Sequence, residues 1–372
     1  MIPVSSGSLF PEPPYQHGTV EKTGILFVNL GTPTSPTTEA LKVYLKEFLS
    51  DPRVVEIPKL LWWPILNLII LNFRPKRSAE KYASIWSKNG SPLRFFSEKQ
   101  VEKVEKELTQ KGINVKVMLA MRYGKPSIEE AIKELKKQAI NKILILPLYP
   151  QFSASTTATV FDKVFEQLIK MRNPPAIRTV KSFHDKKYYV ESIAESVKNF
   201  WSINRKPQVL VFSFHGIPKR SLLKGDPYHC QCHKTARLVA SELNLDDHEW
   251  KICFQSRFGK AEWLKPYTSE TVIDMANKGI SSINVICPGF TSDCLETLEE
   301  IAMELKDDFL NAGGTNFNYI PCLNDSNLGI SLLTNLIEEE TSGWNNTNES
   351  IELTKKNAEK QRQRALELGA DN

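Results

Sequence analysis

A histidine and a row of acidic residues are the side chains of this sequence best suited to proton and metal chemistry. His215 directly follows the apolar run 208–214, which is predicted to be a strand, so its imidazole is expected to project from the end of that strand. Glu296, Glu300 and Glu304 are spaced four residues apart and would share one face of a predicted helix. An imidazole and a carboxylate can together bind a divalent first-row metal or accept protons near neutral pH.

These features also have plainer interpretations. A lone histidine after a strand often only caps a loop, and acidic residues at helical spacing usually belong to a solvated face. The segment from His229 to His233 (His-Cys-Gln-Cys-His) looks like a metal-binding motif, but a single C-x-C lacks the second ligand pair of a structural zinc site. We therefore favour packing or a surface loop for this segment.

Short β-branched runs alternate with helical stretches along most of the chain, which is typical of parallel strands joined by crossover helices. Each half supplies four such runs, so the pattern predicts an α/β protein with two doubly wound, Rossmann-like domains and an active-site cleft between them. Polar residues that follow the strands would then lie where open α/β sheets bind ligands. The predicted strands are 25–30, 115–119, 142–148 and 177–180 in the first half, and 208–214, 250–255, 283–287 and 317–320 in the second.

The domain boundaries follow from these elements. After an N-terminal extension of residues 1–23, the first domain is expected to span 24–185 and the second 186–340. Residues 341–372 combine a polar linker with a charged tail, which we expect to be a solvated helix or disordered. The helix starts that the sequence signals are Ser35-Pro36, the capping box of Ser127 and Glu130, and Asp325.

The composition excludes several classes of protein. The 372 residues are 41% hydrophobic and 24% charged, which supplies a sizeable core and argues against global disorder. A net charge of +5 is too small to indicate a nucleic-acid partner. The six cysteines form no disulfide framework and the first residues lack the pattern of a signal peptide, so we expect a cytoplasmic protein.

The most apolar stretch of the chain is the segment 60–71. Pro64 and Asn67 interrupt it, and it is too short to span a bilayer. Its adjacent Trp62 and Trp63 leave two interpretations open: a core helix, or an apolar lip over the cleft that contacts a membrane surface peripherally.

Eight separated motifs follow one another in order between about residue 24 and about residue 339. Together they resemble the ferrochelatase family, in its proteobacterial branch. The resemblance implies a lyase of haem biosynthesis with a chelatase-like fold, whose partners are protoporphyrin IX and Fe²⁺ and whose product is protohaem. The motifs are Asn29-Leu-Gly-Thr-Pro, Leu61-Trp-Trp-Pro, Tyr82-Ala-Ser-Ile-Trp, Gly90-Ser-Pro-Leu, Arg122-Tyr123, Tyr149-Pro-Gln-Phe-Ser-Ala-Ser-Thr-Thr, Phe212-Ser-Phe-His-Gly-Ile-Pro and Phe290-Thr-Ser-Asp-Cys-Leu-Glu-Thr-Leu.

The resemblance also implies roles for individual residues. His215 and Glu296 would be the catalytic pair and would hold the metal, and Glu300 would lie on an outer path that leads away from the centre. Arginines of the pocket would pair with the propionates of the macrocycle. The residues that would line the macrocycle pocket are Asn29, Leu30, Arg74, Tyr82, Ser91, Arg122, Tyr123, Ser256 and Trp263.

The sequence departs from parts of the family pattern. Ala154 stands where animal members have a cysteine and no cysteine follows Cys322, so we expect no iron–sulfur cluster and no other cofactor; Fe²⁺ is a substrate. Cys294 stands where many members have a histidine. The alternatives are a chelatase for cobalt, nickel or coproporphyrin, and a two-domain protein that binds a tetrapyrrole without chemistry. The sequence leaves the oligomeric state open.

Overall fold

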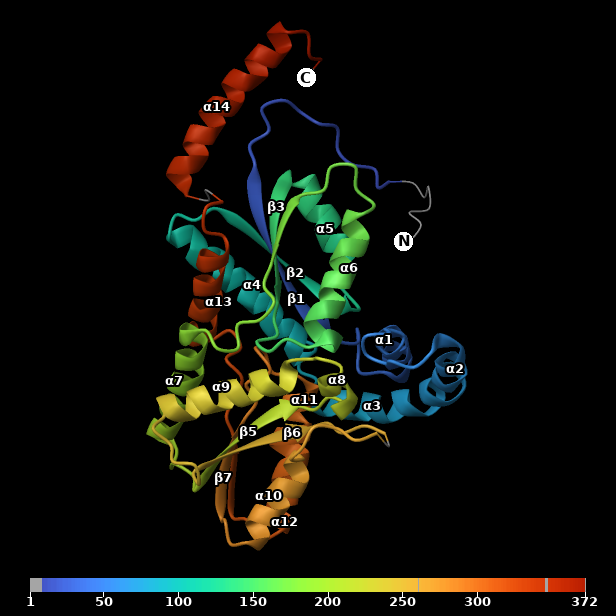
Figure 1. Ribbon diagram of the computed structural model, residues 1–372, viewed down its shortest axis with the longest axis vertical. Coiled ribbons are helices and arrows are strands. Elements are labelled where there is room, and N and C mark those ends of the chain that lie inside the picture. The colour runs from blue at the N-terminus through green and yellow to red at the C-terminus, as the bar shows by residue number, and fades with distance from the viewer. Residues whose placement is uncertain (1–8, 260, 345–346, 372) are drawn as a thin grey trace.

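Two parallel four-stranded sheets form the frame of the protein (Figure 1). The computed structural model describes residues 9–259, 261–344 and 347–371, and these ranges contain every predicted strand. All strand pairs are parallel and both sheets have the same topology, which confirms the α/β class. The first sheet has the order β2 (Val115–Tyr123), β1 (Lys22–Gly31), β3 (Ile140–Pro147), β4 (Ala176–Thr179), and the second has the order β6 (Trp250–Gln255), β5 (Val209–His215), β7 (Ser282–Ile286), β8 (Asn316–Tyr319).

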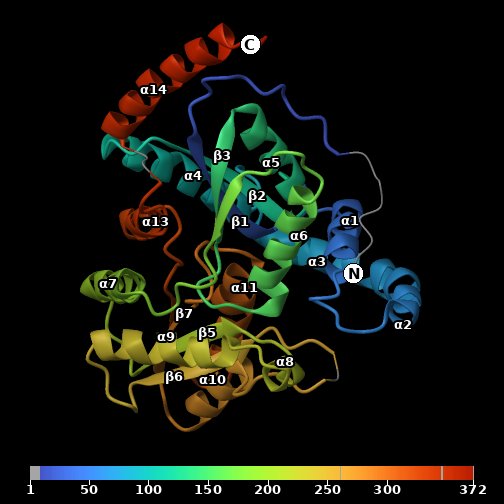
Figure 2. The same cartoon turned by 45° about the horizontal axis from the view of Figure 1, so that its top comes forward.

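Helices cover the sheets and fill the space between them (Figure 2). Three of the helical segments in the described ranges are π-helices, which are wider than α-helices and often mark functional sites. In chain order the helices are α1 (Thr38–Leu49), α2 (Lys59–Pro64), η1 (Ile65–Ile70), α3 (Leu71–Ile85), α4 (Pro92–Gln110), α5 (Ile128–Lys137), η2 (Ala154–Ala158), α6 (Thr159–Leu168), α7 (Lys187–Ile203), α8 (Lys219–Leu223), α9 (Tyr228–Glu242), α10 (Thr268–Asn277), α11 (Leu295–Leu298), η3 (Glu300–Leu305), α12 (Lys306–Asn311), α13 (Asn327–Glu340) and α14 (Asn348–Glu367).

The strands are apolar on both faces because helices cover both faces. In β1, Ile25 and Phe27 belong to the same buried cluster as residues of α4, whereas Leu26 and Val28 pack with residues of α5 and α6. In β5, the burial continues from Val209 to Phe214 and ends at His215, which is half-buried. His215, a candidate functional side chain, therefore lies where the buried part of β5 ends.

One of the three predicted helix starts is confirmed, and the other two helices are capped by a different residue. The capping box of Ser127 and Glu130 is confirmed. The start of α1 is capped by Thr37, two residues after Ser35, because its side chain accepts a hydrogen bond from the backbone of Ala40. The start of α13 is capped by Ser326. The carboxylate of Asp325, which we expected to be the cap, pairs instead with Lys103 on α4 at 2.5 Å.

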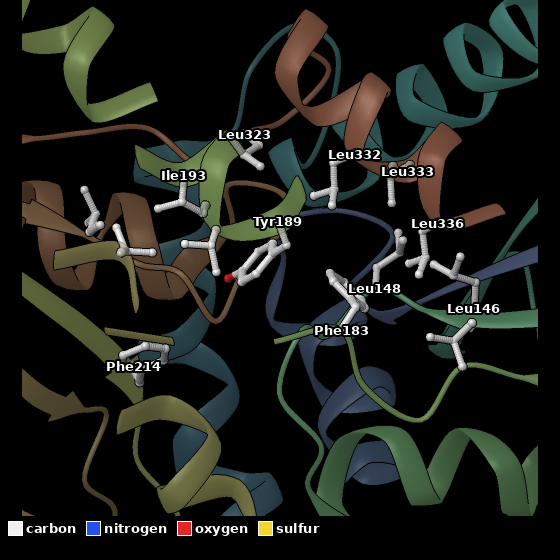
Figure 3. Close-up of a cluster of buried hydrophobic side chains, with 14 of the residues drawn as sticks. Leu146, Leu148, Phe183, Tyr189, Ile193, Phe214, Leu323, Leu332, Leu333 and Leu336 are labelled. Carbon is white, nitrogen blue, oxygen red and sulfur yellow. The ribbon is translucent and has the colours of Figure 1, made fainter. Parts of the chain in front are cut away.

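One hydrophobic core joins the two sheets (Figure 3). Helix α13 belongs to the predicted second domain, yet it packs against α4 of the first half as well as against α7. Leucines of α13 meet Leu146 and Leu148 from β3 and the strand's end, and Phe183 and Tyr189 pack edge to face with 5.6 Å between ring centroids. The two halves are therefore braced against each other along one side.

The charged tail is a helix. Helix α14 extends beyond the first sheet in Figure 1, and most of its described side chains are exposed, in agreement with the solvated-helix interpretation. It lies beside the N-terminal extension, where a side chain on Gly18 would come within 2.8 Å of Cβ of Arg362. Residues 1–8 of the predicted extension and residues 345, 346 and 372 of the predicted tail lie outside the described part of the chain.

The shared core makes a stability prediction. Phe183→Ala removes a fully buried ring at the junction of the two sheets, and we expect a loss of about 3–5 kcal/mol in the free energy of unfolding, measured by chemical denaturation. Ile203→Ala on α7 changes an exposed side chain and should cost less than about 0.5 kcal/mol. A loss of less than about 1 kcal/mol for Phe183→Ala would show that the ring does not join the two halves.

Candidate active site between the two sheets

A pocket lies between the carboxyl ends of the first sheet and the segment that leads into α11. Both walls are largely apolar, with leucines on either side and a few hydroxyl and carboxyl groups between them. Four of the predicted macrocycle-lining residues and one predicted catalytic residue take part in it. The pocket is lined by Asn29, Leu30, Gly31, Thr32, Tyr82, Ser91, Leu93, Leu148, Tyr149, Gly289, Phe290, Thr291, Ser292, Cys294, Leu295 and Glu296.

Polar groups in the first wall are held in place by one another. The Asn29 amide donates to Oγ of Ser97 at 3.0 Å, and its Oδ1 accepts from the backbone of Leu30 at 2.9 Å. Thr32 donates to Oγ of Ser91 at 2.8 Å, so the hydroxyl groups on this wall are fixed as well. Burial raises the pKa of Tyr82 well above its usual value, and this phenol stays neutral. These groups of the first wall therefore present fixed dipoles and apolar surface without a charge.

Arg122 and Tyr123 lie behind this wall and do not line the pocket. The Arg122 guanidinium forms an ion pair with Asp51 and also donates from Nε to the Thr159 hydroxyl at 2.7 Å. Tyr123 is fully buried and donates to the same carboxylate of Asp51 at 2.8 Å. The charge of Arg122 is thus already balanced by a protein carboxylate. This ion pair argues against the expectation that Arg122 pairs with a propionate.

Arg74 is the predicted arginine that faces the acidic side of the site. Its guanidinium lies 4.4 Å from the ring centroid of Phe258, in a cation–π contact. Burial lowers the pKa of Arg74, and the negative charges of Glu300 and Glu296 oppose that shift. Arg74 therefore lies close enough to both acids to interact with them electrostatically.

The predicted catalytic histidine lies at the end of the second sheet and is not among the residues that line the pocket. His215 ends β5, and its Nδ1 lies 2.7 Å from the carbonyl oxygen of Gly216. Because a carbonyl oxygen can only accept a hydrogen bond, Nδ1 carries the proton, and Nε2 of the neutral ring keeps a free lone pair. Trp263 flanks this imidazole at 6.5 Å between ring centroids. The local geometry thus leaves the imidazole ready to accept a proton or bind a metal.

Gln255 pairs with His215 in the second sheet and contacts the segment that carries the acids. It lies opposite His215 in the parallel pairing of β5 and β6, so the two side chains emerge on the same face of the sheet. Its amide nitrogen donates to the Glu296 carbonyl at 2.6 Å and to the Glu300 carboxylate at 3.3 Å. Ser256, in a left-handed backbone conformation with φ of 66°, also donates to Glu300. The amide of Gln255 therefore ties the backbone of Glu296 and the carboxylate of Glu300 to the strand beside the one that carries the histidine.

Glu300 titrates close to neutral pH. Burial, reinforced by the negative charge of Glu296, raises the pKa of Glu300 to about 7, although the hydrogen bonds from Ser256 and Gln255 lower it. A carboxyl group with this pKa can both accept and release protons under physiological conditions. The row of acids is therefore more than a solvated face at this position.

The regular spacing expected for the acidic row is interrupted after Glu300. From this residue the chain continues as the π-helix η3, in which the backbone N–H of Glu304 donates to the carbonyl of Glu299, five residues earlier, at 2.9 Å. Glu304 consequently lies beside Glu299, and both carboxylates contact Lys81. Glu296 and Glu300 lie close enough to interact electrostatically, whereas Glu304 belongs to a separate cluster with Glu299 and Lys81.

The His-Cys-Gln-Cys-His segment forms the first turns of α9, as the packing interpretation predicted. Cys232 is fully buried and Cys230 is exposed, so the two thiols point to different sides of the helix. His229 and His233 lie 4.4 Å apart between ring centroids and pack against Phe254. In the described ranges no three His, Cys, Asp or Glu side chains are arranged as a ready-made metal site.

Two of the residues that hold the site were missing from the predicted set. Gln255 could have been identified because it ends a strand beside the one that carries His215. Asp51 gave no sequence signal, because it lies 71 residues from Arg122 and nothing in its neighbours indicates that contact.

Comparisons with known proteins show the family to which the chain belongs and agree with the fold. The sequence model of the ferrochelatase family matches residues 22–341. A ferrochelatase of Aromatoleum aromaticum is 56% identical over 90% of this chain and 92% of its own length, and one of Nitrosomonas europaea is 49% identical over 97% and 99%.

Solved structures give the fold alone. SirB from Bacillus subtilis, solved with Fe³⁺, has a TM-score of 0.51 and 14% identity, and the match covers 88% of this chain and 99% of SirB. The family match covers most of the chain, both sheets and the pocket between them. The chain belongs to the ferrochelatase family.

Proposed function

We propose that this chain inserts ferrous iron into protoporphyrin IX to form protohaem, and that the reaction takes place in the pocket between the two sheets. Family membership supports the reaction. The observation that supports the site is that Gln255, the strand partner of His215, holds the backbone of Glu296 and the carboxylate of Glu300, while the His215 imidazole keeps a free Nε2 lone pair. These groups lie beside a pocket whose walls are mainly apolar.

Iron insertion replaces two pyrrole N–H protons with one Fe²⁺ ion, so two protons must leave for each ion that enters. Nε2 of His215 can accept a pyrrole proton, because Nδ1 is already protonated. Glu296 and Glu300 offer oxygen ligands to the incoming Fe²⁺ and a route for protons, since Glu300 exchanges protons at neutral pH. The imidazole and the acids therefore divide proton acceptance and metal delivery between them.

The apolar walls suit a flat, hydrophobic macrocycle. Leu30 and Leu148 on one wall and Phe290 and Leu295 on the other offer surface for its faces and rim. Arg74 is better placed than Arg122 to meet a propionate, because Arg122 already pairs with Asp51. Contacts to the rim can supply the binding energy that bends the ring and exposes its nitrogen lone pairs.

Other divalent metals fit the same ligand types, since nitrogen and oxygen donors also accept cobalt and nickel. The pKa of Glu300 argues against a carrier that only binds a tetrapyrrole. A buried acid with a pKa of about 7 suits proton transfer, and a carrier transfers no protons. We also expect no resident iron–sulfur cluster: Ala154 lies at the start of η2, and the thiols of Cys230 and Cys232 diverge.

The exposed apolar side chains of the segment 60–71 favour peripheral contact with a membrane. Leu60, Leu61, Trp63 and Leu68 are largely exposed, whereas Trp62 packs inward and donates from Nε1 to the carbonyl of Leu49 at 2.7 Å. None of the helices within the described ranges is both long and apolar enough to cross a bilayer. An exposed apolar surface on helices that lead into the pocket walls suits insertion into one leaflet.

His215→Ala should lower the rate of iron insertion by about 10²–10⁴-fold, as expected for loss of an acid–base group, and leave porphyrin affinity within about twofold. The assay follows protohaem formation anaerobically, and fluorescence quenching follows porphyrin binding. His248→Ala, which truncates an exposed histidine, is the matched control and should be fully active. More than about a tenth of wild-type turnover in His215→Ala would exclude His215 from the chemistry.

Glu300→Gln should change how stability depends on pH. Because burial raises the pKa of Glu300 from its usual 4.5 to about 7, the folded protein holds a proton between these values that the unfolded chain has released. Wild-type stability should therefore fall as the pH rises through this window, by roughly 3 kcal/mol, and the glutamine variant should not show this fall. Denaturant titrations of both proteins at about pH 5 and about pH 8 measure the difference; parallel curves would contradict the assignment.

Trp63→Ser combined with Leu68→Ser should weaken binding to vesicles of equal amounts of phosphatidylserine and phosphatidylcholine, measured by flotation, and should raise KM for protoporphyrin presented in those vesicles. Both side chains are exposed, so the circular dichroism spectrum and Tm should stay close to wild type. Ile203→Ser, an exposed change on α7, is the control. Unchanged vesicle binding in the double variant would refute a membrane role for this surface.

A further inference from the structure

Lys81 connects the two walls of the active site. It lies on α3, the helix that also carries Arg74 and Tyr82, and its Nζ is 2.9 Å from Oε2 of Glu299 and 2.7 Å from Oε1 of Glu304. Both acids belong to the α11–η3 segment on the opposite wall. One ammonium group thus joins a helix of the first half to the acidic segment of the second.

The spacing of these two acids matters, because they are five residues apart. On an α-helix the neighbours of a residue are three and four positions away, so Glu304 would lie beside Glu300, and Glu299 would lie beside Met303 and not beside another acid. The π-type hydrogen bond from Glu304 to Glu299 brings positions five apart together instead. The ammonium of Lys81 therefore matches the π register of η3.

The π register of η3 also determines which way the carboxylate of Glu300 points. While Glu299 and Glu304 face Lys81, the carboxylate of Glu300 faces Ser256 and Gln255. The Glu299 side chain is only 9% exposed, and two neighbouring carboxylates repel each other unless a cation lies between them. Without Lys81, this repulsion would act directly across the π turn and favour its rearrangement.

We propose that Lys81 is a positioning residue that stabilises the π register of η3 and so directs Glu300 into the active site. The inference rests on the proposed function, because the benefit to Glu300 is a benefit to iron insertion. Lys81 itself has no contact with the pocket lining that would make it a ligand of iron or porphyrin. Its effect should therefore appear in the metal-dependent step and not in porphyrin binding.

The test compares Lys81→Met, which removes the charge but keeps the length, with Lys81→Arg, whose guanidinium can bridge two carboxylates. We expect Lys81→Met to lower kcat for iron insertion roughly tenfold, as is typical for a group that orients a metal or proton ligand, with porphyrin affinity unchanged. Lys81→Arg should retain most activity. Lys76→Met, the same substitution at an exposed lysine on α3, is the matched control and should behave like wild type.

Hydrogen–deuterium exchange gives a readout that does not depend on activity. The peptide that covers 299–305 contains the amide of Glu304, and it should exchange roughly tenfold faster in Lys81→Met than in wild type or Lys76→Met. Glu304→Gln weakens the same bridge from the other side, so its effect on kcat should not add to that of Lys81→Met in the double variant.

Two results in Lys81→Met would overturn the proposal: unchanged exchange of the peptide 299–305, or a kcat within about twofold of wild type. A lower Tm together with loss of porphyrin binding would also overturn it, because it would indicate a general folding defect. An equal loss in Lys81→Arg would also contradict the bridging role. A wild-type protein without iron insertion would refute the proposed function alone, because the exchange experiment still decides whether Lys81 holds the π turn.

Discussion

The direction of the strands is the constraint on which the rest of the structure depends. Because every strand within a sheet is parallel to its neighbours, all carboxyl ends of that sheet meet at one edge. Asn29 and Tyr123 reach the edge of the first sheet, and His215 and Gln255 reach that of the second. Residues far apart in sequence thus meet without long loops, and buried helices on both faces keep the edges rigid.

Within this rigid frame, the site holds titratable groups whose charged forms are disfavoured by burial. Tyr82 stays neutral for that reason, and Glu300 is poised between its two protonation states. The cost of burying Glu300 is offset only in part by hydrogen bonds from Ser256 and Gln255. Cationic Lys81 and Arg74 lie on the opposing wall, so the acids of one half depend on the other half for electrostatic balance.

Much of this arrangement could be predicted from the sequence. The alternation of apolar runs and helical stretches placed all eight strands, and the motif resemblance selected His215, Glu296 and Glu300, which share one region of the structure. What periodicity could not predict is the π turn, because its register depends on a lysine more than two hundred residues away in sequence. The pairing of Arg122 with Asp51 was hidden for the same reason: it is a tertiary contact without a local signature.

The crossing of α13 onto α4 has a consequence for how a bulky ligand reaches the pocket. Two-domain binding proteins with a free hinge admit ligands by swinging open. Here a continuous core on one side resists such a swing, because opening would tear leucines of α13 from those of β3. A bulky ligand therefore has to reach the pocket without a large hinge motion, so its selection can depend on the fixed shape and the apolar character of the pocket walls.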